Sequence, residues 1–96
     1  MVLCRFRTGT SDALRAEIWN DLEKLGARMP GMLSFRAGKN VSPEGLNQGY
    51  THGFVVEFSD AAARDIYLTD PEHIAAGRKL IDALEGGRDG ICVVDI

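Results

Sequence analysis

The ten residues Gly49–Phe58, read as Gly-Tyr-Thr-His-Gly-Phe-Val-Val-Glu-Phe, have the alternating pattern of a β-strand. Successive side chains of a strand point to opposite faces of its sheet. One face of this predicted strand therefore carries Tyr50, His52, Phe54, Val56 and Phe58, and the other carries Thr51, Gly53, Val55 and Glu57. The first face is apolar except for Tyr50 and His52 at its start, which either contact a ligand or cap the edge of the core.

The composition is that of one globular domain spanning residues 1–96. A net charge of -3 argues against nucleic acid and anionic membranes as partners. No apolar run reaches the roughly 20 residues of a membrane span, and residues 1–7 are too short and charged for a signal peptide, so we expect a cytoplasmic protein. Cys4 and Cys92 are expected to be reduced thiols, and neither a metal site nor any other cofactor is expected.

The chain before this strand is predicted to form a strand, a helix and a second strand. Val2–Arg7 alternates between apolar and other residues, which predicts a strand. A helix over 12–27, capped by Thr10 or Ser11, buries a stripe made of Leu14, Ile18, Leu22, Leu25 and Met29, with Trp19 at its edge. The second strand is predicted over Met32–Gly38, with Leu33, Phe35 and Ala37 on one face, and a long loop follows over 39–49.

After the central strand, two helices and a last strand are predicted. Ala61–Leu68 forms a short helix that Ser59 or Asp60 caps. Proline disfavours helical geometry in the residue before it but suits the first position of a helix. The helix therefore breaks at 69–70 and restarts at Pro71 with Asp70 as its N-cap, glycines at 86–87 end it, and Ile91–Ile96 is the last strand.

The resulting order, βαββαβ, predicts an α+β fold of the ferredoxin-like kind, with a four-stranded antiparallel sheet and both helices on one face. The helix-covered face is predicted to consist of Val2, Cys4, Phe6, Leu33, Phe35, Phe54, Val56 and Phe58. The other face keeps apolar area at Val55 and in the last strand. Because exposed apolar sheet surface usually marks an interface, we predict a symmetric homodimer that packs sheet to sheet.

Four segments carry a resemblance to a known family: 30–32, 38–42, 49–58 and 67–73, the last reading Tyr-Leu-Thr-Asp-Pro-Glu-His. Together they resemble the stress-responsive α/β-barrel domain (Dabb) family over nearly the whole chain. The resemblance implies a ferredoxin-like fold and a dimeric α/β barrel. The family often has a histidine where Asp70 stands, and a histidine at the start of its first strand that this sequence lacks.

Some members of that family are plant polyketide cyclases, which close a ring by an intramolecular aldol step in a pocket between sheet and helices. The resemblance implies that their catalytic tyrosine and histidine correspond to Tyr67 and His73, and the histidine of their central strand to His52. Further contacts with a small-molecule ligand are expected from Tyr50, Phe6, Phe54, Phe35 and Cys4.

A histidine beside a tyrosine can transfer protons. His73 falls at about the third position of its helix, where the free amides and the positive end of the helix dipole favour the neutral imidazole. The imidazole would then remove a proton from carbon, and the Tyr67 phenol would stabilise the enolate by hydrogen bonding. The structural alternatives are a capping role for His73, core packing for Tyr67 with its hydroxyl satisfied, and a buried, hydrogen-bonded His52.

These observations favour a small dimeric stress-responsive module that binds an apolar or aromatic molecule. The second interpretation is a cofactor-free enzyme that performs aldol cyclisation or another proton transfer with His73 as base and Tyr67 as hydrogen-bond donor. The third is a purely structural, oligomer-forming protein. A cavity among Tyr67, His73 and His52 favours the first two, whereas a packed core with satisfied hydroxyl and imidazole groups favours the third.

Overall fold

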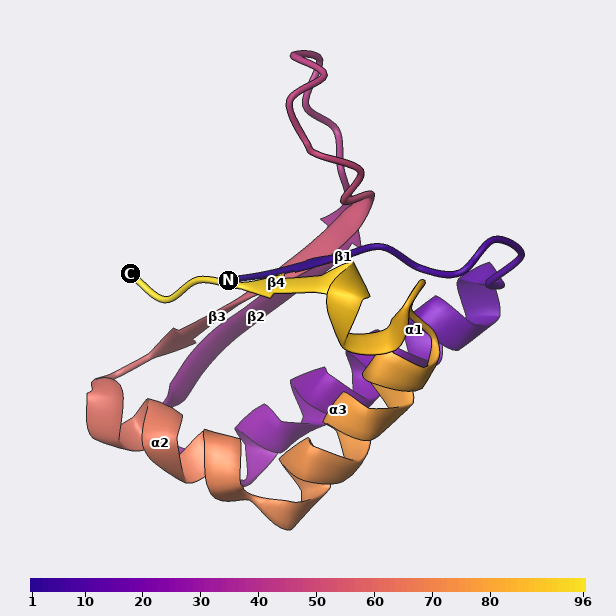
Figure 1. Cartoon of the computed structure of the whole chain (residues 1–96). Coiled ribbons are helices and arrows are strands. Elements are labelled where there is room, and N and C mark those ends of the chain that lie inside the picture. Colours follow the sequence, from indigo (N-terminus) through magenta and orange to yellow (C-terminus); the bar gives the residue numbers. More distant parts are fainter.

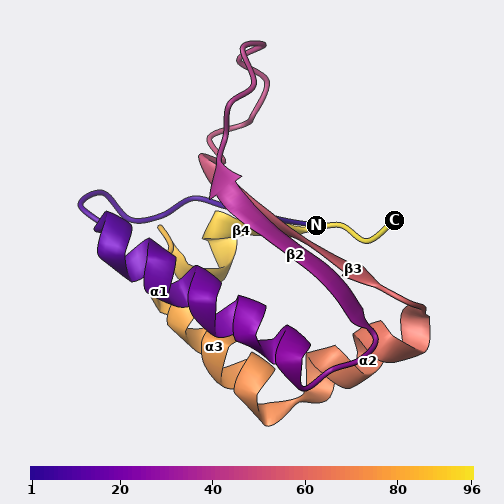
Figure 2. The ribbon, with the colours of Figure 1, turned by 180° about the vertical axis from the view of Figure 1, so that it is seen from behind.

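The computed structural model describes residues 1–96 and has the predicted ferredoxin-like architecture (Figure 1). In chain order the elements are β1 (Val2–Cys4), α1 (Asp12–Glu23), β2 (Met32–Lys39), β3 (His52–Phe58), α2 (Ala61–Thr69), α3 (Pro71–Asp82) and β4 (Ile91–Val93), with 3-10 turns at Lys24–Ala27 and Gly87–Gly90. The strands pair antiparallel in the order β2-β3-β1-β4. The helices lie together on one face of the sheet, as both views show (Figures 1 and 2). None of the helices has the length and apolar character required to cross a membrane.

Each helix begins where the local sequence supplies a cap. The Ser11 hydroxyl accepts a hydrogen bond from the Leu14 amide at 3.1 Å, and the Asp60 carboxylate accepts one from the Ala63 amide at 2.8 Å. Helix α3 ends at Asp82, earlier than predicted. Gly86 and Gly87, which were predicted to end the helix, lie in the turn that follows it. Both have positive φ, 72° at Gly86 and 62° at Gly87, a backbone conformation that favours glycine.

The central strand begins at His52, and Tyr50 is not part of it. Gln48 and Gly49 have φ of 53° and 83°, and the Tyr50 amide donates to the Asn47 carbonyl at 2.9 Å, so the chain turns just before the strand. The Arg5 guanidinium lies over the Tyr50 ring, 5.1 Å from its centroid. Because Arg5 alternates with Cys4 and Phe6, which pack toward the helices, the expectation that Tyr50 shares a face with His52 was wrong.

A β-bulge in β2 changes which residues face the helices. Met32 pairs with Phe58 and Ser34 pairs with Glu57, which leaves Leu33 as the extra residue. Met32 is buried, whereas 60% of Leu33 is exposed. The prediction that Leu33 lies on the helix-covered face was wrong, because an inserted residue shifts the two-residue alternation by one position.

The first and last strands of the chain, β1 and β4, are shorter than predicted. Beyond Cys4 the backbone bonds to the segment before β4: the Arg5 amide donates to the Gly90 carbonyl at 2.8 Å and the Arg7 amide to the Ala83 carbonyl at 3.0 Å. At the other end, the Val94 amide still donates to the Met1 carbonyl at 2.9 Å. Strand β4 ends at Val93, before the predicted Ile96.

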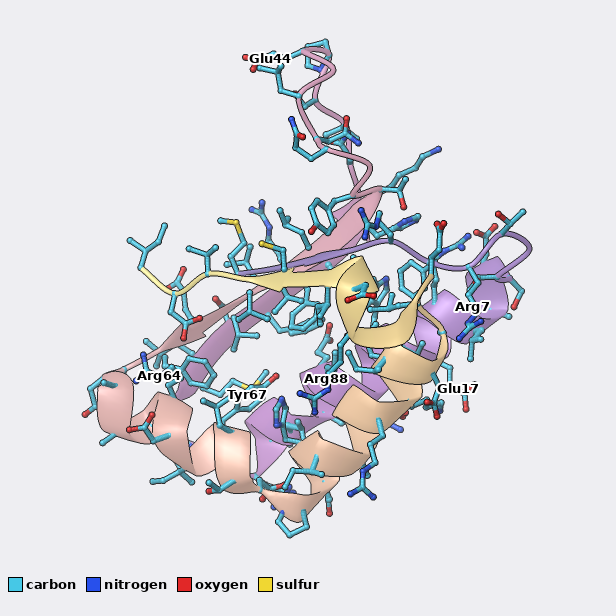
Figure 3. The ribbon with its side chains drawn as sticks, in the orientation of Figure 1. Arg7, Glu17, Glu44, Arg64, Tyr67 and Arg88 are labelled. Atoms are coloured by element: carbon cyan, nitrogen blue, oxygen red, sulfur yellow. The ribbon has the colours of Figure 1, made fainter.

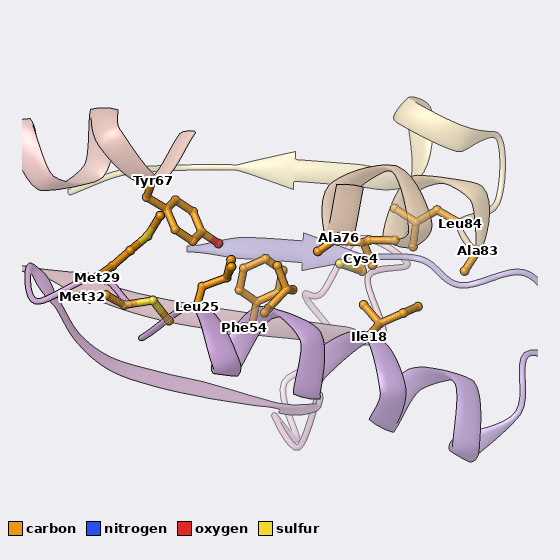
Figure 4. Packing of buried hydrophobic residues seen from close by; sticks show 12 residues of the cluster. Cys4, Ile18, Leu25, Met29, Met32, Phe54, Tyr67, Ala76, Ala83 and Leu84 are labelled. Carbon is orange, nitrogen blue, oxygen red and sulfur yellow. The ribbon is translucent and has the colours of Figure 1, made fainter. Parts of the chain in front are cut away.

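The core lies between the sheet and the helices (Figure 4). Its buried members are Cys4, Ile18, Leu22, Leu25, Met29, Met32, Phe54, Tyr67, Ala76, Leu80, Ala83 and Leu84. Trp19, predicted at the edge of the α1 stripe, is half-buried and makes edge-on ring contacts with Phe6 and Phe54, at centroid distances of 5.8 and 5.6 Å. Trp19 therefore connects the first strand region to the central strand.

The other face of the sheet, called the outer face below, carries no helix (Figure 1). Pairing places Leu3, Gly53 and Cys92 side by side on it, and Val55 lies opposite Arg36. Val55 is 41% exposed and Val94 is 50% exposed. The predicted open apolar surface is therefore present in the single chain.

Candidate functional site

Tyr67 comes from the buried side of α2, one turn after Ala63. Only 5% of the residue is exposed. Its side chain points from α2 toward the interior between helices and sheet (Figures 3 and 4). The Tyr67 ring contacts Phe58 at the end of β3 and His73 at the start of α3, with centroid distances of 5.0 and 4.0 Å. The tyrosine thus lies where the central strand meets the break between two helices.

The break between α2 and α3 places His73 beside that tyrosine. Asp70 has an extended backbone, with ψ of 131°, as expected for a residue that precedes proline. Its carboxylate accepts hydrogen bonds from the amides of Glu72 at 2.9 Å and His73 at 3.2 Å. Asp70 is therefore the N-cap that the sequence predicts, and His73 is the third residue of α3.

Arg28, which the sequence analysis did not identify, holds this break from outside. It follows the 3-10 turn after α1, and its guanidinium donates to the Asp70 carboxylate at 2.9 Å. A second ion pair joins it to Glu72 at 3.1 Å. The hydrogen bond from Arg28 is the main reason why the pKa of Asp70 lies below its ordinary value. No local pattern in the sequence could pair these residues, because Arg28 and Asp70 are 42 positions apart.

Two buried polar atoms at this site have no hydrogen-bond partner in the protein: the Tyr67 hydroxyl oxygen and His73 Nδ1. Most buried polar groups are paired, because an unpaired one costs about 1–3 kcal/mol. The satisfied hydroxyl that the structural alternative requires for Tyr67 is therefore not present. It is the His73 backbone amide, not its ring, that bonds to Asp70.

The protonation states suit hydrogen bonding to a ligand. Burial raises the pKa of Tyr67 to about 12, so the phenol stays protonated and can donate. Burial also lowers the pKa of His73, against smaller opposing effects of the Leu68 backbone and the Asp70 charge. The neutral imidazole expected from the sequence is thus favoured, but its main cause is burial and not the helix dipole.

His52 lies away from this pair. It begins β3, whereas Phe58, which contacts Tyr67, ends the strand, and six residues of strand span about 20 Å. The His52 ring contacts Phe6 at 5.2 Å, and its Nδ1 lies 2.8 Å from the Thr51 hydroxyl. Burial, followed by the positive charges of Arg15 and Lys39, lowers the pKa of His52. The structure therefore joins Tyr67 with His73 and leaves His52 in a separate, hydrogen-bonded setting.

The other residues predicted to contact a ligand are distributed over the core. Phe35 and Phe54 have ring centroids 5.6 Å apart, and Phe6 belongs to the cluster around Trp19 and His52. Cys4 is fully buried, and burial raises the pKa of its thiol to about 12, so it packs as a small neutral side chain. No group of three or more His, Cys, Asp and Glu side chains is arranged to hold a metal ion. Phe58, which the sequence analysis assigned only to the core, contacts the tyrosine directly.

The fold and the site define a class: a small ferredoxin-like domain with a buried tyrosine–histidine pair at the break between its second and third helices. The family described as Stress responsive A/B Barrel Domain matches residues 1–96, and the chain belongs to this family. The resemblance noted in the sequence is thereby confirmed.

Three relatives show how much of the chain the similarity covers. The stress-response A/B barrel domain-containing protein HS1 of Arabidopsis thaliana is 30% identical over 95 residues, covering 99% of this chain and 84% of HS1. Olivetolic acid cyclase of Cannabis sativa is 25% identical over 77 residues, covering 80% of this chain and 76% of the cyclase. A crystal structure described as a dimeric ferredoxin-like protein of unknown function from Jannaschia sp. CCS1 superposes with a TM-score of 0.92 at 34% identity, covering 99% of this chain and 92% of the other.

Proposed function

We propose that this protein is a homodimeric stress-response module that binds a small apolar or aromatic molecule at the Tyr67–His73 pair. The observation that carries the proposal is the pair of unpartnered polar atoms, the Tyr67 hydroxyl and His73 Nδ1, whose rings lie 4.0 Å apart. A ligand that hydrogen-bonds to both atoms removes their desolvation penalty. The surrounding aromatic and aliphatic side chains, Phe58 among them, would contact its apolar body.

The outer face supports the dimer. It exposes Val55 and Val94 beside Leu3 and Cys92, with no element of the same chain over them. A second copy that packs on this face would bury apolar area on both chains, and the Jannaschia relative is described as dimeric. A Val55→Lys variant places a charge in the middle of that face. Sedimentation velocity should then find a monomer where the wild type is a dimer, and a wild type that is monomeric at high micromolar concentration would refute this part of the proposal.

The binding proposal is tested by a thermal-shift screen against small aromatic and polyketide-like compounds. A ligand present at a hundredfold excess over its Kd stabilises the native state by about 2.7 kcal/mol, which raises the midpoint by roughly 10 °C for a domain of this size. The shift should be absent in His73→Ala and reduced in Tyr67→Phe. His52→Ala is the matched control, because it removes a histidine outside the pair and should keep the shift. A hit that shifts all four proteins equally would show that the ligand binds elsewhere.

A second candidate function is cofactor-free proton transfer, such as an intramolecular aldol cyclisation. It is favoured by one observation: a neutral imidazole and a protonated phenol are in ring contact. Olivetolic acid cyclase is also a relative of this chain. In this mechanism His73 removes a proton from carbon and Tyr67 donates a hydrogen bond to the enolate oxygen. Loss of deuterium from an α-deuterated ketide that binds in the screen should be accelerated by wild type and not by His73→Ala; equal rates would exclude the reaction for that compound.

A further inference from the structure

A hollow of about 330 Å³ lies on the outer face, where the β2–β3 hairpin leaves the sheet. The residues between β2 and β3 project as an arm beyond the strands (Figures 1 and 2). Its lining includes Tyr50, Asn40 and Asn47 from the base of this arm, and Leu3 and Val55 from the sheet. It differs from the Tyr67–His73 site in position, because neither residue lines it and the two sites lie on opposite faces of the sheet.

The floor of the hollow is a pair of glycines. Gly38 in β2 lies directly opposite Gly53 in β3, so this row of the sheet has no side chains on its outer face until it reaches Leu3 in β1. Gly53 is required by the fold, because a Cβ there would lie 2.8 Å from the Val2 carbonyl oxygen. Gly38 is not: its φ is not positive, and a Cβ there would meet no atom within 4 Å. Glycine weakens the interior of a strand, and at 38 it leaves open space that the fold does not require.

The charged side chains among the lining residues are all basic. Arg36 lies on the outer face opposite Val55, and no Asp or Glu lines the hollow, although the chain has 14 acidic against 11 basic residues. Lys39 pairs with His52, so its side chain belongs to the helix-covered face. The Asn47 side chain donates to the Tyr50 carbonyl at 2.9 Å, which fixes the base of the arm where it lines the hollow. Glu57 shares the outer face but lies beyond Val55, outside the lining. The hollow therefore has an apolar wall and one cationic side chain, Arg36, on the same face of the sheet.

We propose that this hollow is a second ligand site, which takes an anionic amphipathic molecule: an apolar body against Leu3, Val55 and the glycine floor, and a carboxylate or sulfonate beside Arg36. Guanidinium and carboxylate form charge-assisted hydrogen bonds, and the apolar wall excludes water from one side. Ligand binding in the hollow is independent of the Tyr67–His73 pair. In the dimer proposed above, the second copy covers the outer face and encloses the ligand between the two sheets.

The test is a titration with 2-naphthoate, followed by amide chemical shifts and calorimetry, with uncharged 2-naphthalenemethanol as the comparison ligand. Gly38→Val fills the floor with a residue that strands accommodate well, and naphthoate should then bind at least about tenfold more weakly. Arg36→Gln should weaken naphthoate severalfold and leave the alcohol unchanged. Gly77→Ala is the matched control, because its Cβ also meets no atom within 4 Å but lies on α3; it should bind like wild type. His73→Ala should also bind naphthoate normally, which separates this site from the first.

Three results would overturn the proposal. The first is no shift of the amides around Gly38 and Gly53 at millimolar naphthoate. The second is equal binding by wild type and Gly38→Val. The third comes from sedimentation: if Gly38→Val raises the dissociation constant of the dimer tenfold or more, the hollow is filled by the second copy and not by a ligand. The proposal expects that constant to stay within about threefold of wild type, because the hollow would be open space between the chains.

Discussion

Gly31 is the point where the start of β2 meets α2, and its replacement by alanine should disturb both stability and the site. A Cβ at Gly31 would lie 2.5 Å from the Ala63 Cβ and 3.2 Å from the Ser59 hydroxyl. Carbon atoms prefer separations of about 3.5–4.0 Å, so the strand and the helix must move apart by roughly 1 Å. Because the φ of Gly31 is not positive, the whole effect comes from this overlap.

Overpacking of this size costs about 1–3 kcal/mol. We therefore expect Gly31→Ala to lower the free energy of unfolding by about 2 kcal/mol and the thermal midpoint by roughly 10 °C. Ala63 and Tyr67 are one helical turn apart on the same side of α2, so the displacement should also reach the Tyr67–His73 contact. Urea unfolding followed by circular dichroism measures the first effect, and the ring chemical shifts of Tyr67 and His73 report the second.

Two variants make this prediction refutable. Gly38→Ala adds the same methyl group to β2 where it meets no atom within 4 Å, so its stability should match or slightly exceed that of wild type. Ala63→Gly costs about 0.5–1 kcal/mol alone because glycine weakens a helix, yet combined with Gly31→Ala it should restore most of the lost stability. Equal stabilities for Gly31→Ala and Gly38→Ala, or strictly additive effects in the double variant, would show that the overlap is not the cause.

The remaining predictions concern charge. Burial lowers the pKa of His52 and His73 in the folded state, so the unfolded chain, with a histidine pKa near 6.5, takes up protons first as the pH falls. Stability should therefore be level between about pH 7.5 and 9 and fall below about 6.5. His73→Gln should reduce that slope in urea titrations. The Cys4 pKa is raised from 9.0 to about 12, so stability should decline between about pH 9 and 10, by up to about 1.4 kcal/mol per pH unit, and Cys4→Ala should lack this decline. Above about pH 10 the raised pKa of Tyr67 adds a decline that Cys4→Ala keeps. Arg28→Met removes the donor to Asp70, so the amide of His73 should exchange with deuterium faster than in wild type, while amides in β3 do not change.

Much of the fold follows from short-range patterns. The alternation in β3, the stripe of α1 and the Asp70-Pro71 dipeptide each act through neighbouring residues, and their elements appear where the sequence predicts them. The predicted face of Leu33 is wrong because the bulge in β2 depends on its pairing with β3. The predicted face of Tyr50 is wrong because positive φ at Gln48 and Gly49 turns the chain before the strand. Neither depends on hydrophobic periodicity.

The site was predicted only in part for the same reason. Tyr67 and His73 are close in sequence, and the proline break brings their rings together. The positions of His52 and Arg28 relative to the pair depend on which elements meet in space. The length of β3 separates His52 from the pair, and the end of α1 brings Arg28 to Asp70. The missing partners of the two polar atoms are likewise a property of packing, which the sequence does not display.

The central claim, that the Tyr67–His73 pair is kept for a ligand and not for the fold, is tested most directly by the stability of Tyr67→Phe without ligand. The variant removes a hydroxyl that is buried and has no partner, while it keeps the ring between Phe58 and His73. Removing such a group relieves its desolvation cost, so the free energy of unfolding should stay equal or rise by about 1 kcal/mol. A decrease of more than about 1 kcal/mol would mean that the hydroxyl makes a stabilising hydrogen bond in the folded protein, and the pair would then be structural.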